Sequence, residues 1–256
     1  MANRYKLYNI NNELLCTITD QSLKVLDTEF PVEVEIIERS YKPGADFPGI
    51  QREESKELVF TYDINYQSEQ DFRNYYNLLS RNFRATRTIR DDINSMTTDV
   101  LLNNQSVTYD EGGFNLGAKV TVTFVQLTPY WEDAAFTTLT ASGIGTTQIV
   151  GINNGYIDTP PIITLTALEQ ITKFSIRILE TGDGILIRDL QFGINGLNTY
   201  IIDNKEGTSE LNQLDRRDKI KSGTGFFDMQ VGSNTFDIQS NGNMLIEINF
   251  KKRYYI

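Results

Sequence analysis

The residues best suited to catalysis in this chain are carboxylates, because two acidic side chains at the right separation can cleave a glycosidic bond without histidine. They form two groups, Glu33, Glu35 and Glu38, and then Glu53, Glu54 and Glu57. The first group lies along an expected strand and the second follows a Pro-Gly turn, so we expect both groups to face solvent. Nothing in the pattern marks one carboxyl group as buried and another as exposed. We therefore predict no catalytic residue.

Two further motifs match ligand-binding sites only in part, and one cysteine offers a thiol. Gly143 and Gly145 match the first two glycines of a dinucleotide loop, but the third glycine and a following helix pattern are missing, which favours a hairpin turn. Residues 203–207, Asp-Asn-Lys-Glu-Gly, resemble a calcium loop, yet Lys205 stands where an oxygen ligand is needed, which favours a turn. Cys16 lies in a strand pattern without cationic neighbours, as expected of a core thiol. We predict no metal site and no cofactor.

Histidine is absent from the 256 residues, and cysteine occurs once. The sequence therefore offers no Ser-His or Cys-His nucleophile, no His-ligated zinc and no side chain with an unperturbed pKa near neutrality. A single cysteine also excludes an intrachain disulfide and a multi-cysteine metal cluster. We expect a protein that is not an enzyme.

The chain is acidic, with 24 Lys and Arg against 34 Asp and Glu and a net charge of −10. Because affinity for nucleic acids comes mainly from Lys and Arg, this charge argues against wrapping DNA or RNA. It is compatible with a surface that DNA must pass without sticking. No stretch approaches the ~18–20 apolar residues of a membrane span, and the first residues lack the apolar run of a signal peptide. We expect the protein to stay in the compartment where it is made.

The elements that carry these residues are mostly strands. Residues 30–38, 58–62 and 119–125 alternate apolar with polar side chains and are rich in the β-branched and aromatic residues that suit a pleated sheet.

One segment, residues 68–81, has helical spacing instead. Its apolar side chains recur at i, i+3, i+4 and i+7, and they are Phe72, Tyr75, Tyr76 and Leu79. Ser68 is a natural N-cap, and Asp71 three residues later can reach back to it. We predict a single amphipathic helix packed against a sheet.

Arg84, Arg87 and Arg90 recur every third residue directly after the predicted helix. Such a row is ordinarily the solvated edge of a strand or loop. The alternative is a contact with the acidic strand faces of a neighbouring subunit.

Beyond Trp131 the sequence consists of strand-like runs separated by Gly, Asn and Pro turns. The runs cover residues 136–139, 147–152, 162–165, 174–179, 185–190, 199–202, 226–230, 235–238 and 244–250, with turns at 153–155, 182–184 and 241–243. Regularly spaced short strands are typical of an antiparallel β-sandwich. We predict a mainly β protein with a barrel-like first domain at residues 1–131, which contains the helix, and a β-sandwich at residues 132–256.

The order of these elements and their local sequences resemble the phage distal tail protein family, the hub component of long-tailed, siphophage-like tails. In the first domain the resemblance rests on the helix at residues 72–79 and on the closing strand at residues 120–131, which ends in Pro-Tyr-Trp. In the second it rests on residues 154–156, 160–163, 174–182, 200–203, 222–229, 231–236 and 245–255. The likeness covers the whole chain, and its weight lies in the order and spacing of the motifs.

This resemblance implies a homo-hexameric ring at the tip of the tail tube, formed by the N-terminal domains, with galectin-like C-terminal sandwiches projecting outward. The implied partners are the tail tube protein, a tail-associated baseplate protein and receptor-binding proteins or adhesins. Phage DNA would pass through an acidic channel, and no part would insert into a membrane. The implied location is the virion tail tip, after synthesis in the host cytoplasm, and the family has no catalytic residues to carry over.

Two other classes of protein remain open from the sequence. A carbohydrate-binding, lectin-like host-recognition module would use exposed aromatic residues on the sandwich, and the chain has 13 Tyr and 14 Phe. Another ring-forming tail tube protein would share the acidic lumen and the β-barrel. A large C-terminal sandwich is hard to fit into a smooth stacked tube.

Overall fold

The computed structural model divides into two compact units, residues 1–134 and residues 135–255. It describes residues 5–18, 22–25, 28–31, 35–39, 57–66, 68–109, 116–128, 130–189, 192–193 and 198–255. Within these residues the chain forms strands β1 to β19, one α-helix and one short 3₁₀-helix. The prediction of a mainly β fold with one α-helix is confirmed.

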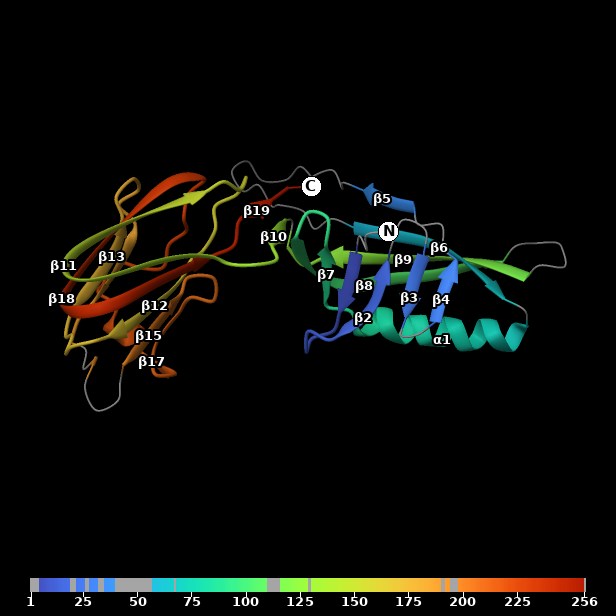
Figure 1. Cartoon of the computed structure of the whole chain (residues 1–256), viewed down its shortest axis with the longest axis horizontal. Coiled ribbons are helices and arrows are strands. Elements are labelled where there is room, and N and C mark those ends of the chain that lie inside the picture. The colour runs from blue at the N-terminus through green and yellow to red at the C-terminus, as the bar shows by residue number, and fades with distance from the viewer. Residues whose placement is uncertain are drawn as a thin grey trace. The chain divides into compact units, whose positions relative to one another are not determined.

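The first unit is built around a curled antiparallel sheet (Figure 1). Its strands are β1 (Tyr5–Tyr8), β2 (Leu14–Ile18), β3 (Ser22–Val25), β4 (Thr28–Pro31), β5 (Glu35–Arg39), β6 (Glu57–Tyr66), β7 (Thr88–Asp91), β8 (Met96–Tyr109), β9 (Leu116–Gln126) and β10 (Trp131–Asp133). They pair in the order β4-β3-β2-β1-β7-β8-β9-β6-β5, and β10 pairs with β8. Although β4 and β6 are far apart in this order, they contact each other, so the sheet curls into a partial barrel as predicted.

Two of the strands predicted in this unit lie inside longer ones. Residues 58–62 lie within β6, and residues 119–125 lie within β9. The predicted strand 30–38 is different, because β4 ends at Pro31 and β5 begins at Glu35. Residues 32–34 between them lie outside the described part of the chain.

Helix α1 (Glu69–Ala85) begins at the predicted cap but continues one turn further than predicted. The Ser68 hydroxyl oxygen accepts from the Asp71 N–H at 3.2 Å, and the same hydroxyl donates to the Asp71 carboxylate at 2.7 Å. We expected residues 82–85 in a strand or loop edge, and this was wrong. Phe83 extends the apolar face by four residues from Leu79 and is 1% exposed, so packing favours the additional turn.

The apolar face of α1 packs on the inner face of the sheet (Figure 1). The ring of Phe72 contacts Tyr66 at 4.9 Å and Tyr109 at 5.4 Å between ring centres. Near the other end, the ring of Phe83 contacts Phe124 edge-on at 6.1 Å. Burial of each such aromatic side chain contributes about 1.5–3 kcal/mol. The helix therefore fixes β6, β8 and β9 relative to one another.

The second unit is organised by one long ribbon of two strands, β11 (Thr137–Asn153) and β18 (Gly232–Phe250), which pair along their whole length. The other strands are β12 (Ile162–Ala167), β13 (Phe174–Ile178), β14 (Gly184–Ile187), β15 (Thr199–Asp203), β16 (Thr208–Leu211), β17 (Leu214–Asp215) and β19 (Arg253–Tyr254), with the 3₁₀-helix η1 at Arg217–Lys219. The first half of β18 pairs with β13, and the second half pairs with β12. Each half of the ribbon thus belongs to a different group of strands.

These two groups of strands pack face to face. Ile176 and Ile238 from the β13 side and Ile163 and Ile248 from the β12 side are all at most 1% exposed and belong to one core cluster. Since alternate residues of each strand point inward, the outward faces of both layers are left for polar side chains. The predicted antiparallel β-sandwich is confirmed.

The structure of the second unit corrects three local predictions, two of them in the long ribbon. Gly143 and Gly145 do not form a hairpin turn but lie within β11 at a register shift, where Gly145 has a φ of +80°. Residues 241–243 lie within β18 rather than in a turn. Glycine with positive φ serves bulges as well as turns, so the two are alike in sequence. The predicted strand 226–230 is also wrong, since only an isolated bridge between Met229 and Thr159 forms there.

Candidate interaction surfaces

The residues singled out for chemistry do not come together in the described part of the chain. The Cys16 thiol in β2 is 2% exposed, and burial raises its pKa to about 12, so it is a core residue as expected. Glu57 accepts a hydrogen bond from the Asn103 amide at 3.0 Å and is partly exposed. Glu33, Glu53 and Glu54 lie outside the described residues, as do the side chains of Glu35 and Glu38.

The segment that resembled a calcium loop forms the turn between β15 and β16. The Asp203 carboxylate accepts from the backbone N–H groups of Lys205 at 2.9 Å and Glu206 at 3.0 Å, and Gly207 has a φ of +63°. Its oxygen is thus used to hold the turn. Among the described residues, no group of three or more acidic or sulfur ligands is placed to hold a metal ion.

The three arginines spaced by three residues are distributed over three elements. Arg84 is exposed in the last turn of α1, and Arg87 donates to the carbonyl oxygens of Arg84 at 2.9 Å and Thr86 at 2.8 Å. Arg90 in β7 pairs with Asp92 at 2.9 Å. Arg87 and Arg90 therefore have local structural roles, and Arg84 remains on the surface.

The outer face of β8 and β9 is a candidate contact surface of the first unit. Cross-strand partners on this face are Leu101 with Val125, Asn104 with Thr123, and Ser106 with Thr121. Lys119 is the only charged residue of β9, and it lies at the far end of this face opposite Thr108. At the other end of this face, Asp99 of β8 is exposed two residues before Leu101 and accepts a hydrogen bond from Thr88. The cross-strand pairs between Asp99 and Lys119 are uncharged, and such a row is suited to contact with protein. We call it the β8–β9 outer face.

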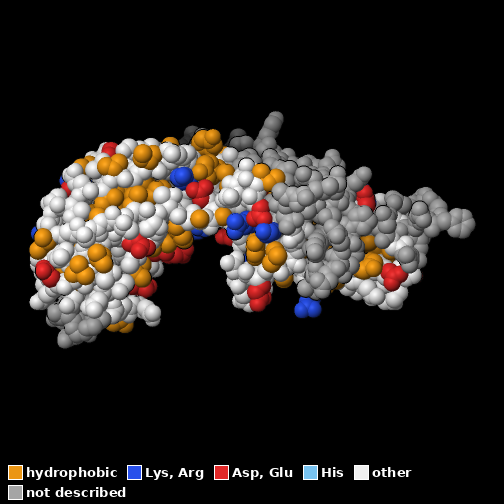
Figure 2. Space-filling model, viewed as in Figure 1, with side chains coloured by type: hydrophobic (Ala, Val, Ile, Leu, Met, Phe, Trp, Pro, Cys, Tyr) orange, Lys and Arg blue, Asp and Glu red, His pale blue; other side chains and the backbone are white. Residues whose placement is uncertain are grey.

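Most large aromatic side chains of the second unit lie in its core, and the exposed Tyr156 is not coplanar with its aromatic neighbour. Phe174, Phe192, Tyr200 and Phe236 are fully buried. Tyr156 is 70% exposed, but it meets Tyr254 edge-on at an interplanar angle of 88°. Figure 2 shows that hydrophobic side chains reach the surface of this unit in scattered patches among uncharged atoms.

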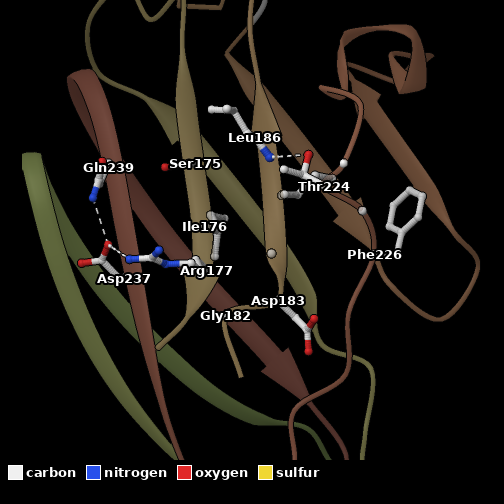
Figure 3. A pocket seen from close by; sticks show the side chains of 14 residues that line it. Ser175, Ile176, Arg177, Gly182, Asp183, Leu186, Thr224, Phe226, Asp237 and Gln239 are labelled. Carbon is white, nitrogen blue, oxygen red and sulfur yellow. Dashed lines mark hydrogen bonds and ion pairs between the residues drawn. The ribbon is translucent and has the colours of Figure 1, made fainter. Parts of the chain in front are cut away.

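A pocket of about 430 Å³ lies on the outward side of β13, β14 and the first half of β18. One wall carries Arg177, Asp237 and Gln239, and the opposite wall is the loop of residues 223–226 with Thr224 and Phe226 (Figure 3). The small residues Ser175 and Gly184 line it between the two walls. The β13–β14 hairpin turn, with Asp183, closes one end.

Asp237 is the centre of the polar wall, and it is 6% exposed. Its carboxylate accepts from the amide nitrogens of Gln239 at 3.0 Å and Gln148 at 3.3 Å, and Arg177 lies 3.8 Å away (Figure 3). Each partner comes from a different strand, since Arg177 is in β13, Gln148 in β11 and Gln239 in β18. The carboxylate thus contacts three planar side chains at the sheet surface, two by hydrogen bonds and one by an ion pair.

This pocket was not predicted from the sequence. The signal was present as alternation, because Ser175 and Arg177 alternate with buried apolar residues of β13, and Asp237 and Gln239 alternate with buried apolar residues of β18. Which strands stand side by side could not be read from alternation alone. The pocket exists because β13 pairs with β18 across about 60 residues of sequence.

No helix among the described residues is long and apolar enough to cross a membrane.

Comparison with known proteins gives one family and similar folds. Residues 154–254 match the family described as siphovirus-type tail component, C-terminal domain. The structure is similar to the Dit protein of phage SPP1, described as a paradigm of the hub adsorption apparatus in phages that infect Gram-positive bacteria. The TM-score is 0.62 at 16% identity, over 97% of this chain and 98% of that chain. A chain of the phage P2 baseplate, in its activated conformation with Ca, matches with a TM-score of 0.44 at 11% identity over 98% of both chains. No curated protein sequence matches.

Proposed function

We propose that this chain is a siphophage distal tail protein that forms a hub ring at the tail tip. The family match of its second unit and the fold of its whole length support this proposal. The ring would join the tail tube to the tail-associated baseplate protein and would carry receptor-binding proteins or adhesins at its periphery. The observation that carries this proposal is the end-to-end similarity to the SPP1 Dit protein, which spans 97% of this chain and 98% of that one.

The distribution of charge supports a ring formed by the first unit. Residues 1–134 contain 13 Lys and Arg against 21 Asp and Glu, a difference of −8. Residues 135–255 contain 11 against 13, a difference of −2. A channel for DNA should repel phosphates, because basic side chains would bind them and slow passage. The unit with the larger negative charge is therefore the better candidate to surround the channel.

The β8–β9 outer face supplies a surface for the contact between neighbouring copies. A closed ring needs a heterologous contact, in which two different surfaces of each copy meet. Ser106 and Asn104 are exposed on this face, and Leu101 is 43% exposed. An uncharged sheet face with an exposed leucine can be buried in a contact without leaving an unpaired charge.

The role proposed here is structural and non-enzymatic. A tail hub acts by binding several partners at once, and it needs rigid surfaces rather than a reactive centre. Two separately packed cores, one in each unit, suit such a role. The first unit would hold the ring, and the second would present its outward strand faces to peripheral proteins.

Native mass spectrometry of the purified full chain tests this proposal. Six copies of the 29.2 kDa chain give a ring of about 175 kDa. We expect Ser106→Glu to abolish this species, because it places a charge in the contact, and Asn77→Glu on the exposed side of α1 to preserve it. A wild-type chain that stays monomeric at tens of micromolar, and is also absent from purified tails, would contradict the ring. A ring that survives Ser106→Glu would contradict only the choice of surface.

A further inference from the structure

The pocket on β13, β14 and β18 carries exposed hydrogen-bonding groups in the second unit, whereas the β8–β9 outer face that is proposed to form the ring lies in the first unit. The guanidinium of Arg177 has five N–H donors, and its side chain is 54% exposed. Among the described residues, its ion-pair partner is Asp237 at 3.8 Å. The Gln239 amide gives its nitrogen to Asp237, which leaves its carbonyl oxygen as an acceptor at an exposed position. Hydrogen-bond donors and an acceptor thus lie side by side on one wall of the pocket.

The charges that line the pocket disfavour an anionic ligand. Arg177 contributes one positive charge, while Asp183 and Asp237 contribute two negative charges. The net charge of the lining is therefore −1, and Asp237 lies close enough to Arg177 to offset its attraction for an anion. A neutral ligand that both donates and accepts hydrogen bonds matches these groups better.

The strand edges at the pocket are not open to a peptide strand. β13 lies between β14 and β18, so both of its edges are paired. The outer edge of β14 is covered by the chain at 219–225, where Lys221 N–H donates to Leu186 O at 2.9 Å and Gly225 N–H donates to Gly184 O at 3.0 Å. A peptide that binds by adding a strand needs a free edge. The pocket does not offer one.

We propose that this pocket binds a neutral saccharide. Neighbouring sugar hydroxyls would accept from Arg177 and donate to the Gln239 carbonyl, in the way that planar polar side chains recognise groups that are both donors and acceptors. Leu186 and the partly exposed ring of Phe226 supply apolar surface for the C–H face of the sugar ring. The volume of about 430 Å³ is in the range of small-ligand sites. This site is independent of the ring, since all its residues lie in the second unit.

The test is binding of the full chain to an array that carries neutral oligosaccharides of glucose, galactose and N-acetylglucosamine, beside glycerol-phosphate oligomers and extended peptides. The strongest binder is then titrated by calorimetry against three variants. Arg177→Ala and Gln239→Ala remove the proposed contacts, and Asp237 keeps an amide donor from Gln148 in both. Arg217→Ala is the matched control, because Arg217 is exposed, pairs with Asp215 and lies outside the pocket.

We expect a neutral oligosaccharide to bind, with affinity reduced about tenfold or more in Arg177→Ala and Gln239→Ala and within about twofold of wild type in Arg217→Ala. Binding only to glycerol phosphates or only to peptides would overturn the proposal. So would the absence of any binder, or binding that both pocket variants retain. Native mass spectrometry of the same preparations shows whether the ring forms. Because ring formation does not involve the pocket, loss of saccharide binding can be distinguished from loss of the ring.

Discussion

At the scale of single residues, Asp228 gives the clearest pH dependence. Partial desolvation raises the pKa of its carboxyl group above the ordinary value of 3.8, Arg253 opposes this rise, and Asp158 adds to it. A raised folded-state pKa means that folding favours the protonated form. Its contribution to stability is complete below the unfolded-state pKa and is lost as the pH rises through the folded-state pKa.

We therefore expect Asp228→Asn to raise the urea midpoint of the second unit at pH 7, and we expect this gain to disappear as the pH falls below 3.8. Unfolding is followed by circular dichroism, because the only Trp, Trp131, lies in the first unit. Glu206→Gln, which removes the charge of another exposed carboxylate in the same unit, is the control. An equal gain for both variants at every pH would contradict the role of desolvation at Asp228.

Some single-residue roles could be predicted from sequence and others could not. Cys16 was predicted as a core residue because its neighbours form a strand pattern, and it is 2% exposed. Arg87 could not be assigned, because its use of the Arg84 and Thr86 carbonyl oxygens depends on where α1 ends. Asp237 could not be assigned either, because its partners Gln148 and Arg177 lie on strands that are far apart in sequence.

At the scale of elements, α1 holds the sheet of the first unit through its buried face. Phe72 is 5% exposed and packs on three aromatic rings, and Phe72→Ala should cost about 3–5 kcal/mol through lost burial and a residual cavity. Arg73 on the opposite side pairs with Glu69 at 2.6 Å in an exposed i,i+4 pair, so Arg73→Ala should cost about 0.5 kcal/mol or less.

Urea unfolding followed by Trp131 fluorescence measures both variants, because Trp131 is 5% exposed within the same core cluster as Phe72. If Arg73→Ala proves as damaging as Phe72→Ala, the assignment of the two helix faces is wrong.

The β11–β18 ribbon yields a second prediction at this scale. Gly242 lies where β18 passes from one group of strands to the other, and a Cβ atom there would stand 2.5 Å from the Gln170 carbonyl oxygen. Gly242→Ala should therefore cost about 1–3 kcal/mol. Gly225→Ala is matched to it, because a Cβ atom at Gly225 meets nothing within 4 Å, and it should be neutral. Scanning calorimetry compares the melting temperatures of the two variants. Equal melting temperatures would contradict the close backbone contact at Gly242.

Element types were more predictable than element lengths. The helix followed from 3.6-residue spacing, and the sandwich followed from alternating short runs. Two long strands, β11 and β18, were each predicted as two separate strands, because Gly145 and Gly242 are turn-like residues inside them. These glycines allow a bulge and a close backbone contact, and neither depends on local sequence alone.

At the scale of the whole molecule, the two units differ in charge more than in size. Most of the net charge of −10 belongs to residues 1–134, and the saccharide pocket belongs to residues 135–255. This division agrees with the proposal that the first units surround a channel for DNA and that the second units bind other molecules. Sequence composition predicted the acidic character of the chain, and the division between Ala134 and Ala135 adds the acidic Glu132 and Asp133 to the first unit.

The proposed function requires that copies of this chain form a closed ring in the tail tip. Electron cryo-microscopy of purified tails tests it most directly, because the curled sheet with α1 and the β-sandwich can be recognised separately in a density map. We expect a sixfold ring at the tip of the tail tube, with the first units around the channel and the second units at the periphery. A tail tip whose ring density fits neither unit, or in which the second units surround the channel, would contradict this account.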